Sequence, residues 1–196
     1  MSRTLSFVFA ILVSACAGAV HAADAPVIPG DSVYRFDATL SDQSGASFRL
    51  SARRGRPLLV AMFYTSCRYV CPLIIDSAKG VEHALSESER KQLGIVLISL
   101  DPARDDTAAL KSVFDKRKLD AARWTLARTS ETNVRTLAAL LGVRYRALAD
   151  GEFNHTSALV LLDGEGRRLA SSEALGAKPD PEFLAAVRKA IGSSPE

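Results

Sequence analysis

The sequence lacks a hydrophobic run long enough to make a convincing transmembrane helix. Its first apolar stretch, Leu5–Val13, is soon interrupted by Ser14, Gly18 and His21. A helix that spans a membrane needs about 20 mostly apolar residues. We therefore expect no transmembrane helix in this chain.

The sequence also lacks internal repeats, low-complexity tracts and a concentrated basic surface. Its formal net charge of +3 is spread along the chain, and no aromatic residues lie among the basic clusters at 53–56 and Lys116–Lys118. Proteins that bind nucleic acid usually gather such charge on one face, so we expect no nucleic-acid partner. With 47% apolar and 24% charged residues among 196, the composition is typical of one globular domain with a real core.

The first 23 residues have the three regions of a bacterial secretory signal peptide: a basic start, an apolar run and small residues ending at Ala22 and Ala23. Residues 24–30 are predicted to be a linker, and residues 31–192 the domain. This organisation predicts export to the periplasm. The segment Val13–Cys16 also fits a lipoprotein processing site, in which a lipid on Cys16 would anchor the protein to a membrane surface.

Cysteine is scarce, and its placement is informative. The chain has three cysteines, and removal or lipidation of Cys16 leaves Cys67 and Cys71, which share one motif. An exported protein folds in an oxidising compartment, where such a pair can form a disulfide. A disulfide that closes so short a loop restricts the unfolded chain little. The pair is therefore predicted to be reactive or to bind a metal.

Apolar runs and helical spacings alternate along the domain. We expect central strands at Leu58–Tyr64, Gly94–Leu100 and Trp124–Ala127, and helices at Val70–Leu85, 106–118 and Glu131–Leu141. Residues 86–91 are expected to be a polar helix end or turn, and Val143–Leu148 an irregular or strand segment. Turn signals predict an N-terminal hairpin from Tyr34–Leu40 and Phe48–Leu50, and a later hairpin from Ser157–Leu162 and Arg167–Ala170, followed by a helix at Pro181–Ile191. The order predicts an α/β, thioredoxin-like fold with a mixed central sheet, helices on both faces and an added N-terminal β-hairpin.

The two cysteines lie between a predicted buried strand and a predicted helix. If the helix begins near Cys67, Cys67 and Cys71 share one helical face, and Cys67 lies closest to the free backbone N–H groups. The helix dipole and Arg68 should lower the pKa of at least one thiol. Pro72 fits a first helical turn. Two thiolates at this spacing can cycle between dithiol and disulfide, or bind a soft metal ion.

A third donor would favour the metal. Beyond the leader the histidines are His83 and His155. His83 falls about three helical turns from the cysteines and is expected to be exposed. His155 falls on the predicted loop that leads into the later hairpin, on the side of the sheet where the helix with the cysteines starts. Together with Cys67 and Cys71 it would make a set of two sulfurs and one nitrogen suited to Cu(I) and able to hold Cu(II), whereas zinc would need a fourth ligand.

Three stretches resemble the Sco/SenC family of copper proteins. They are the Cys-x-x-x-Cys-Pro motif at 63–72, the Asp-Pro segment at 99–105, and His155-Thr156-Ser157 with the turn at 161–166. Their order along residues 31–191 makes the resemblance more specific than a Cys pair alone. It implies a thioredoxin fold, copper held by Cys67, Cys71 and His155, and an acidic residue, Asp101, near the site. Asp101 could equally serve as a turn or capping carboxylate.

The resemblance also implies a function, namely delivery of copper to the binuclear site of a cytochrome c oxidase subunit or a related copper enzyme, or reduction of thiols there. The chain departs from the family in two places: the family often has a Gly before the Tyr, where this chain has Met62-Phe63-Tyr64, and a Pro-Asp after the first Cys, where it has Arg68-Tyr69. Because Arg68 disfavours a cationic metal and favours a thiolate, it shifts the balance toward redox chemistry or another client.

Three functions remain open from the sequence. The first is a copper chaperone that hands copper to a client protein by ligand exchange. The second is a thiol-disulfide oxidoreductase that keeps client cysteines reduced through Cys67 and Cys71, with redox partners and no need of His155. The third is a peroxidase of the peroxiredoxin kind. The sequence favours it less than the other two, because a peroxidase's reactive cysteine would need neither a second cysteine four residues on nor a distant histidine.

Overall fold

The computed structural model describes residues 27–67 and 69–192. The predicted signal peptide, Cys16 and Arg68 lie outside the described residues, so the predictions that concern them stay predictions. Within these two ranges, no helix is both long and apolar enough to cross a membrane.

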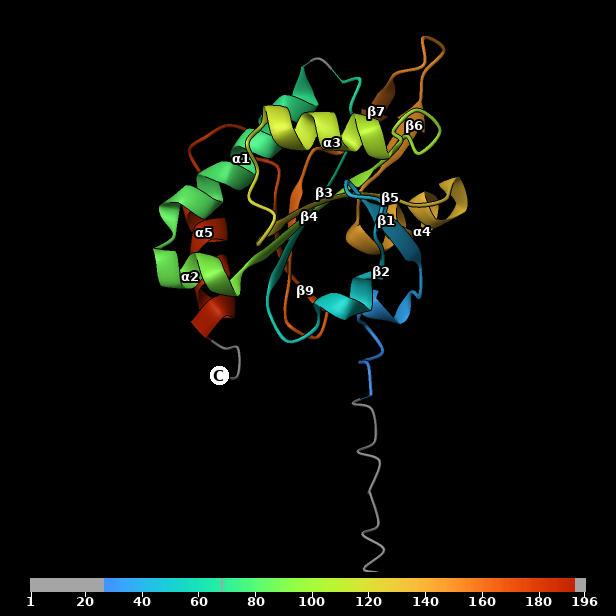
Figure 1. Cartoon of the computed structure of the whole chain (residues 1–196). Coiled ribbons are helices and arrows are strands. Elements are labelled where there is room, and N and C mark those ends of the chain that lie inside the picture. Colours follow the sequence, from blue (N-terminus) through green and yellow to red (C-terminus); the bar gives the residue numbers. More distant parts are fainter. Residues whose placement is uncertain (1–26, 68, 193–196) are drawn as a thin grey trace, which may run out of the picture.

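A sheet of seven strands forms the centre of the domain (Figure 1). In spatial order its strands are β2 (Ser47–Arg49), β1 (Thr39–Asp42), β5 (Trp124–Arg128), β4 (Gly94–Ser99), β3 (Leu58–Phe63), β8 (Leu159–Leu162) and β9 (Arg168–Ser172). The strands β3, β4 and β5 are parallel, and every other neighbouring pair is antiparallel. All residues of β3 and β4 are buried, as expected of continuous apolar runs in the middle of a covered parallel sheet.

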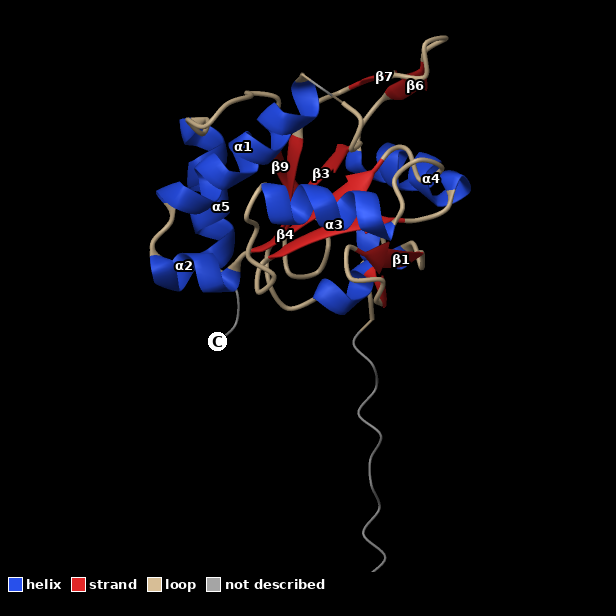
Figure 2. Ribbon diagram, turned by 45° about the horizontal axis from the view of Figure 1, so that its top comes forward, coloured by secondary structure: helices blue, strands red, loops and turns tan. Residues whose placement is uncertain are grey.

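Five helices are described: α1 (Val70–Ala84), α2 (Glu87–Gln92), α3 (Thr107–Lys116), α4 (Glu131–Leu141) and α5 (Pro181–Gly192). The helix α1 packs on β3 and β8, α3 on β5 and β1, and α5 on β9. Because the crossovers β3–α1–β4 and β4–α3–β5 run in the same direction across the sheet, right-handed connections place α1 and α3 on one face. The helix α4 leads back the other way and packs against the N-terminal turn on the other face; Figure 2 shows α3 in front of the strands. The predicted thioredoxin-like fold is confirmed.

The predicted N-terminal hairpin exists, but it begins later than expected. Residues Val33–Arg35 form a 3-10 turn, and the first strand is Thr39–Asp42. The turn is stabilised by a hydrogen bond in which the Ser32 hydroxyl accepts the Tyr34 N–H at 3.0 Å. Val33 and Tyr34 are both buried, whereas neighbouring side chains of a half-buried strand would point to opposite faces. The hairpin extends the sheet beside β5.

Two other segments are more regular than the sequence predicted. The polar residues 86–91 begin a separate helix, α2, because Ser86 and Glu89 form a capping box. The ambiguous segment after α4 contains strand β6 (Tyr145–Ala147), which pairs with β7 (Phe153–His155) in a two-stranded ribbon outside the main sheet. His155 therefore lies at the end of a strand and not on a loop.

Candidate metal and thiol site

The loop that carries the cysteines connects the carboxyl end of β3 to α1. The helix begins at Val70, as its helical spacing predicted, so Cys67 lies before the helix and not in its first turn. The reason is a turn in which the Cys67 N–H donates to the Tyr64 carbonyl at 3.4 Å. The Cys67 Sγ then accepts the N–H of Cys71 at 3.3 Å, which is one of the backbone groups left free at a helix start. Cys67 thus precedes the helix and caps it with its thiol.

The two thiols have opposite environments. Burial raises the pKa of Cys71, whose side chain is 3% exposed, even though the Tyr64 N–H donates to its Sγ at 3.4 Å. Burial also opposes ionisation of Cys67, but hydrogen bonds from the backbone and side chain of Cys71 outweigh it and lower the pKa of Cys67. Cys67 is therefore the accessible thiol with thiolate character, and Cys71 the protected one.

The ribbon of β6 and β7 brings His155 to the cysteines. Its Nε2 lies 4.0 Å from the Cys71 Sγ, and its Nδ1 lies 3.1 Å from the Thr156 carbonyl. A carbonyl only accepts, so Nδ1 carries the proton in that contact and Nε2 presents its lone pair toward the sulfur. Burial lowers the pKa of His155 and favours this neutral form. The sequence-predicted histidine is brought to the Cys pair, and His83 is exposed on α1 as expected.

Tyr64 joins the ribbon to the cysteine loop. Its hydroxyl donates to Glu152 Oε2 at 2.8 Å and accepts the Phe153 N–H at 3.4 Å. Its ring packs edge-on against those of Phe153 and His155, with centroids 5.3 and 5.9 Å away. Neither Tyr64 nor Glu152 could be identified from the sequence, since the two residues are 88 positions apart and no local pattern connects them.

Asp105 holds the other side of the loop. Its carboxylate is fully buried and accepts the Thr65 N–H at 3.2 and 3.1 Å and the Thr65 hydroxyl at 2.5 Å. The Ser99 hydroxyl donates to it at 2.5 Å. Burial raises the pKa of Asp105, although these hydrogen bonds oppose the rise. Asp105 was missed from the sequence, where it is one of several acidic residues in a turn.

Asp101 has the turn role rather than a place at the cysteines. Its carbonyl accepts the N–H groups of Arg104 and Asp105 at 3.1 and 2.9 Å. Its carboxylate pairs with the Arg104 guanidinium, which also donates to the Gly151 carbonyl. Asp101 thereby supports the tip of the β6–β7 ribbon.

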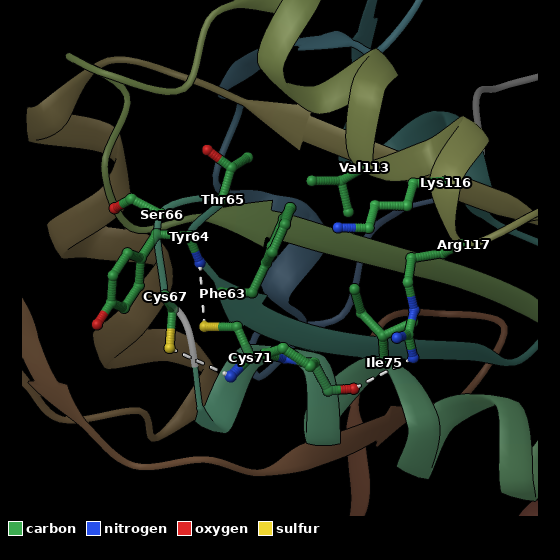
Figure 3. Close-up of a pocket in the computed structure, with 11 residues that line it drawn as sticks. Phe63, Tyr64, Thr65, Ser66, Cys67, Cys71, Ile75, Val113, Lys116 and Arg117 are labelled. Carbon is green, nitrogen blue, oxygen red and sulfur yellow. Dashed lines mark hydrogen bonds between the residues drawn. The ribbon is translucent and has the colours of Figure 1, made fainter.

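A cavity of about 370 Å³ adjoins the Cys pair between α1 and the end of α3 (Figure 3). Cys67 and Cys71 form part of its wall, together with residues of the loop and of both helices. The sulfur of Cys67 is therefore reachable from a concave surface and not only from a flat one.

The donor set suits a soft metal, and its geometry is partly assembled. Ligand atoms bonded to one metal at about 2.0 to 2.3 Å are about 3.5 to 4 Å apart, which matches the 4.0 Å between Cys71 Sγ and His155 Nε2. Across residues 27–67 and 69–192, no three His, Cys, Asp or Glu side chains are gathered tightly enough to hold a metal as they stand. Cys67 would have to close on the Cys71–His155 pair to complete such a site.

Comparisons with known proteins found a curated relative, similar solved structures and a matching family model. A "Putative copper-binding protein" of Stutzerimonas stutzeri is 33% identical over 73 residues, which span 37% of this chain and 36% of that protein's length. The crystal structure of a "putative electron transfer protein" from Aquifex aeolicus VF5 matches with a TM-score of 0.70 and 26% identity, covering 84% of this chain and 92% of that one. The structure of Bradyrhizobium japonicum ScoI with copper bound shares the fold, with a TM-score of 0.65 and 22% identity over 78% of this chain and 96% of that one. The SCO1/SenC family model matches residues 30–192, and the chain belongs to that family.

Proposed function

We propose that this protein is a copper chaperone that binds one copper ion through Cys67, Cys71 and His155. The observation that carries the proposal is the pairing of a protonated Nδ1, held by the Thr156 carbonyl, with an Nε2 lone pair that faces the Cys71 sulfur. Two sulfurs and one imidazole nitrogen form a soft set that favours Cu(I) and tolerates Cu(II). The copper-bound fold of the Bradyrhizobium relative and the name of the Stutzerimonas protein support the same metal.

The copper would be cargo rather than a resident cofactor. A site whose ligands are only partly assembled without the metal can also open, and opening allows a client's ligands to replace those of this protein one at a time. We propose a client with its own copper site, such as a cytochrome c oxidase subunit, in the periplasm. A lipid on Cys16 would bring the protein to the membrane surface where such a client lies.

The copper proposal is tested by anaerobic retention of Cu(I) in single variants. Cys67→Ser should abolish retention, and His155→Ala should lower the affinity at least about 10-fold, since even groups that only orient ligands contribute about that much. His83→Ala is the matched control, because this histidine is exposed on α1. Wild-type affinity in His155→Ala, in a protein that is still folded by circular dichroism, would show that the three-ligand site is wrong.

The unequal thiols favour thiol-disulfide exchange as a second function. An accessible thiol with a lowered pKa next to a buried thiol with a raised pKa is the arrangement in which one cysteine attacks and the other resolves the mixed disulfide. This function needs no histidine ligand. Dithiol turnover with a model disulfide that persists in His155→Ala, while Cu(I) retention falls, would show that the exchange does not need the histidine. Loss of both activities in Cys67→Ser would show that they share this cysteine.

A further inference from the structure

The cavity beside the cysteines has two walls of different chemistry. One wall consists of the cysteine loop and the first turns of α1, and the other of Val113, Lys116 and Arg117 on and just after α3. Phe63, Ile75 and Val113 supply apolar surface between them. Figure 3 shows this cavity with Cys67 at one end and Lys116 at the other. A group held at the Lys116 end would therefore share the cavity with the thiols but lie at the far end from Cys67.

The charge of the lining is one-sided. Among the described residues that line the cavity, two are cations and none carries a carboxylate. Arg117 is already engaged, because its guanidinium pairs with Asp76 and donates to the Pro72 carbonyl. Lys116 has no carboxylate partner among the described residues, and its amine extends into the cavity (Figure 3). The cavity is therefore suited to a ligand with a negative group some way from a sulfur.

The surface outside the cavity indicates what kind of molecule carries that group. Tyr69, which lies between the two cysteines in the sequence, and Leu73, two residues after Cys71, are 82% and 42% exposed. A small thiol could fill the cavity but would leave both side chains in water. A protein partner would cover them, as expected of exposed apolar residues at the edge of a binding site.

We propose that the cavity receives a cysteine-bearing segment of the client protein in which an acidic side chain lies within one or two residues of the cysteine. Lys116 pairs with that carboxylate, while Tyr69 and Leu73 contact the flanking residues of the segment. The inference rests on the proposed function, because it assumes that the Cys pair of this protein meets a cysteine of its client. It adds the specificity of that encounter, which the family assignment does not contain.

The test uses a measurable exchange reaction as its probe. Two peptides carry one cysteine as a mixed disulfide with 2-thiopyridine and differ only in Glu or Gln at the next position. The Cys67 thiolate attacks the peptide sulfur, the bond between peptide and thiopyridine breaks, and pyridine-2-thiolate leaves and is read by its absorbance. The experiment uses Cys71→Ser, so that each protein molecule reacts once.

The expected readout is the ratio of the Glu and Gln rates at low ionic strength. An ion pair at a partly exposed site changes a rate by about two- to fivefold, so the Glu peptide should react faster by that factor. Adding Lys116→Gln should bring the ratio to about 1, and Lys116→Glu should reverse it. Lys118→Gln is the control, because it removes the same charge two residues away and does not line the cavity. Using a ratio cancels any general effect of the substitution on the reactivity of Cys67.

A ratio near 1 in the parent, or one that Lys116→Gln leaves unchanged, would overturn the proposal. An exchange rate that depends on Lys116 with oxidised glutathione, but with neither peptide, would also overturn the proposal, because the cavity would then be a site for small thiol compounds. Cu(I) retention by Lys116→Gln should equal that of wild type. Failure of the peptide test with normal retention would therefore reject the docking site and leave the copper proposal standing.

Discussion

Replacing Asp105 should show how the cysteine loop is held. The carboxylate is fully buried and accepts hydrogen bonds from three groups: the Thr65 N–H, the Thr65 hydroxyl and the Ser99 hydroxyl. Asp105→Ala leaves these donors without an acceptor, at a cost of about 1 kcal/mol each. Part of that cost is offset, because the variant no longer buries a carboxylate. We expect the free energy of unfolding at neutral pH to fall by about 2 kcal/mol.

Asp105→Asn is the more discriminating change. It keeps the shape and one acceptor oxygen, so its cost at neutral pH should be about 1 kcal/mol. Asp106→Asn is a matched control at the next position, where Asp106 caps α3 through the Ala109 N–H at 2.7 Å. Since Asn caps helices about as well as Asp, the control should change stability little.

The stability difference between wild type and Asp105→Asn should depend on pH. Burial raises the pKa of Asp105 above its ordinary 3.8, so the fold disfavours the charged form. The resulting penalty is absent below the pKa of the unfolded chain, grows as pH rises from there, and is complete above the raised pKa of the folded state. Asn cannot ionise. The stability advantage of wild type over Asp105→Asn should therefore be larger at about pH 4 than at about pH 7.

Urea unfolding of wild type, Asp105→Asn and Asp106→Asn across that pH range measures the advantage directly. An advantage that shrinks toward acid would mean that the carboxylate is stabilised in its charged form, and would refute the reasoning. A cost below about 0.5 kcal/mol for Asp105→Ala at neutral pH would show that the loop does not depend on this residue.

Three further experiments test other features of the structure. Iodoacetamide should label Cys67 before Cys71 at neutral pH, because the pKa of Cys67 is lowered and that of Cys71 is raised. The labelling rate of Cys67 should reach its plateau at a pH below the ordinary thiol pKa of about 8.5. Equal labelling of the two cysteines in mass-spectrometric peptide maps would contradict this. Tyr64→Phe removes the hydroxyl bound to the ribbon and should cost about 1 kcal/mol in urea unfolding and lower Cu(I) affinity without abolishing it; unchanged affinity would mean that the ribbon needs no such support. Gly166→Ala should lower the free energy of unfolding by about 2 to 4 kcal/mol, because φ is +82° and the added Cβ would lie 2.5 Å from the Tyr34 ring. Gly45→Ala is the control and should cost clearly less, because φ is similar at +85° but the nearest atom to the added Cβ is 3.9 Å away.

The sequence predicted the sheet well because its signals are local. A continuous apolar run such as Leu58–Tyr64 can only be a buried strand or helix segment, and its length and flanking residues favour a strand. The position of His155 near the cysteines followed from the order of strands and helices. The helical spacing also predicted the start of α1 at Val70. The capping of α1 by the Cys67 thiol did not follow, because it depends on hydrogen bonds of Cys67 with Tyr64 and Cys71 that a helical spacing does not reveal.

The residues that build the site around the cysteines were beyond local reasoning for the same reason. Asp106 shows a capping signal three residues from its partner, whereas Asp105 acts on Thr65, 40 positions away. The pairing of β6 with β7 was not predicted, since each strand has only three residues. Short strands carry too little alternation to be distinguished from loops.

The two halves of the candidate site are anchored to different parts of the molecule. The cysteine loop is tied by Asp105 to the end of β4 in the buried core, whereas His155 belongs to a ribbon outside the main sheet. Tyr64 contacts both halves, since its N–H donates to the Cys71 sulfur and its hydroxyl donates to Glu152. Because local opening costs least where few contacts are buried, the ribbon should separate from the loop before the loop leaves the core. If copper is passed on by ligand exchange, His155 is therefore the donor that should leave first, while both sulfurs still hold the ion.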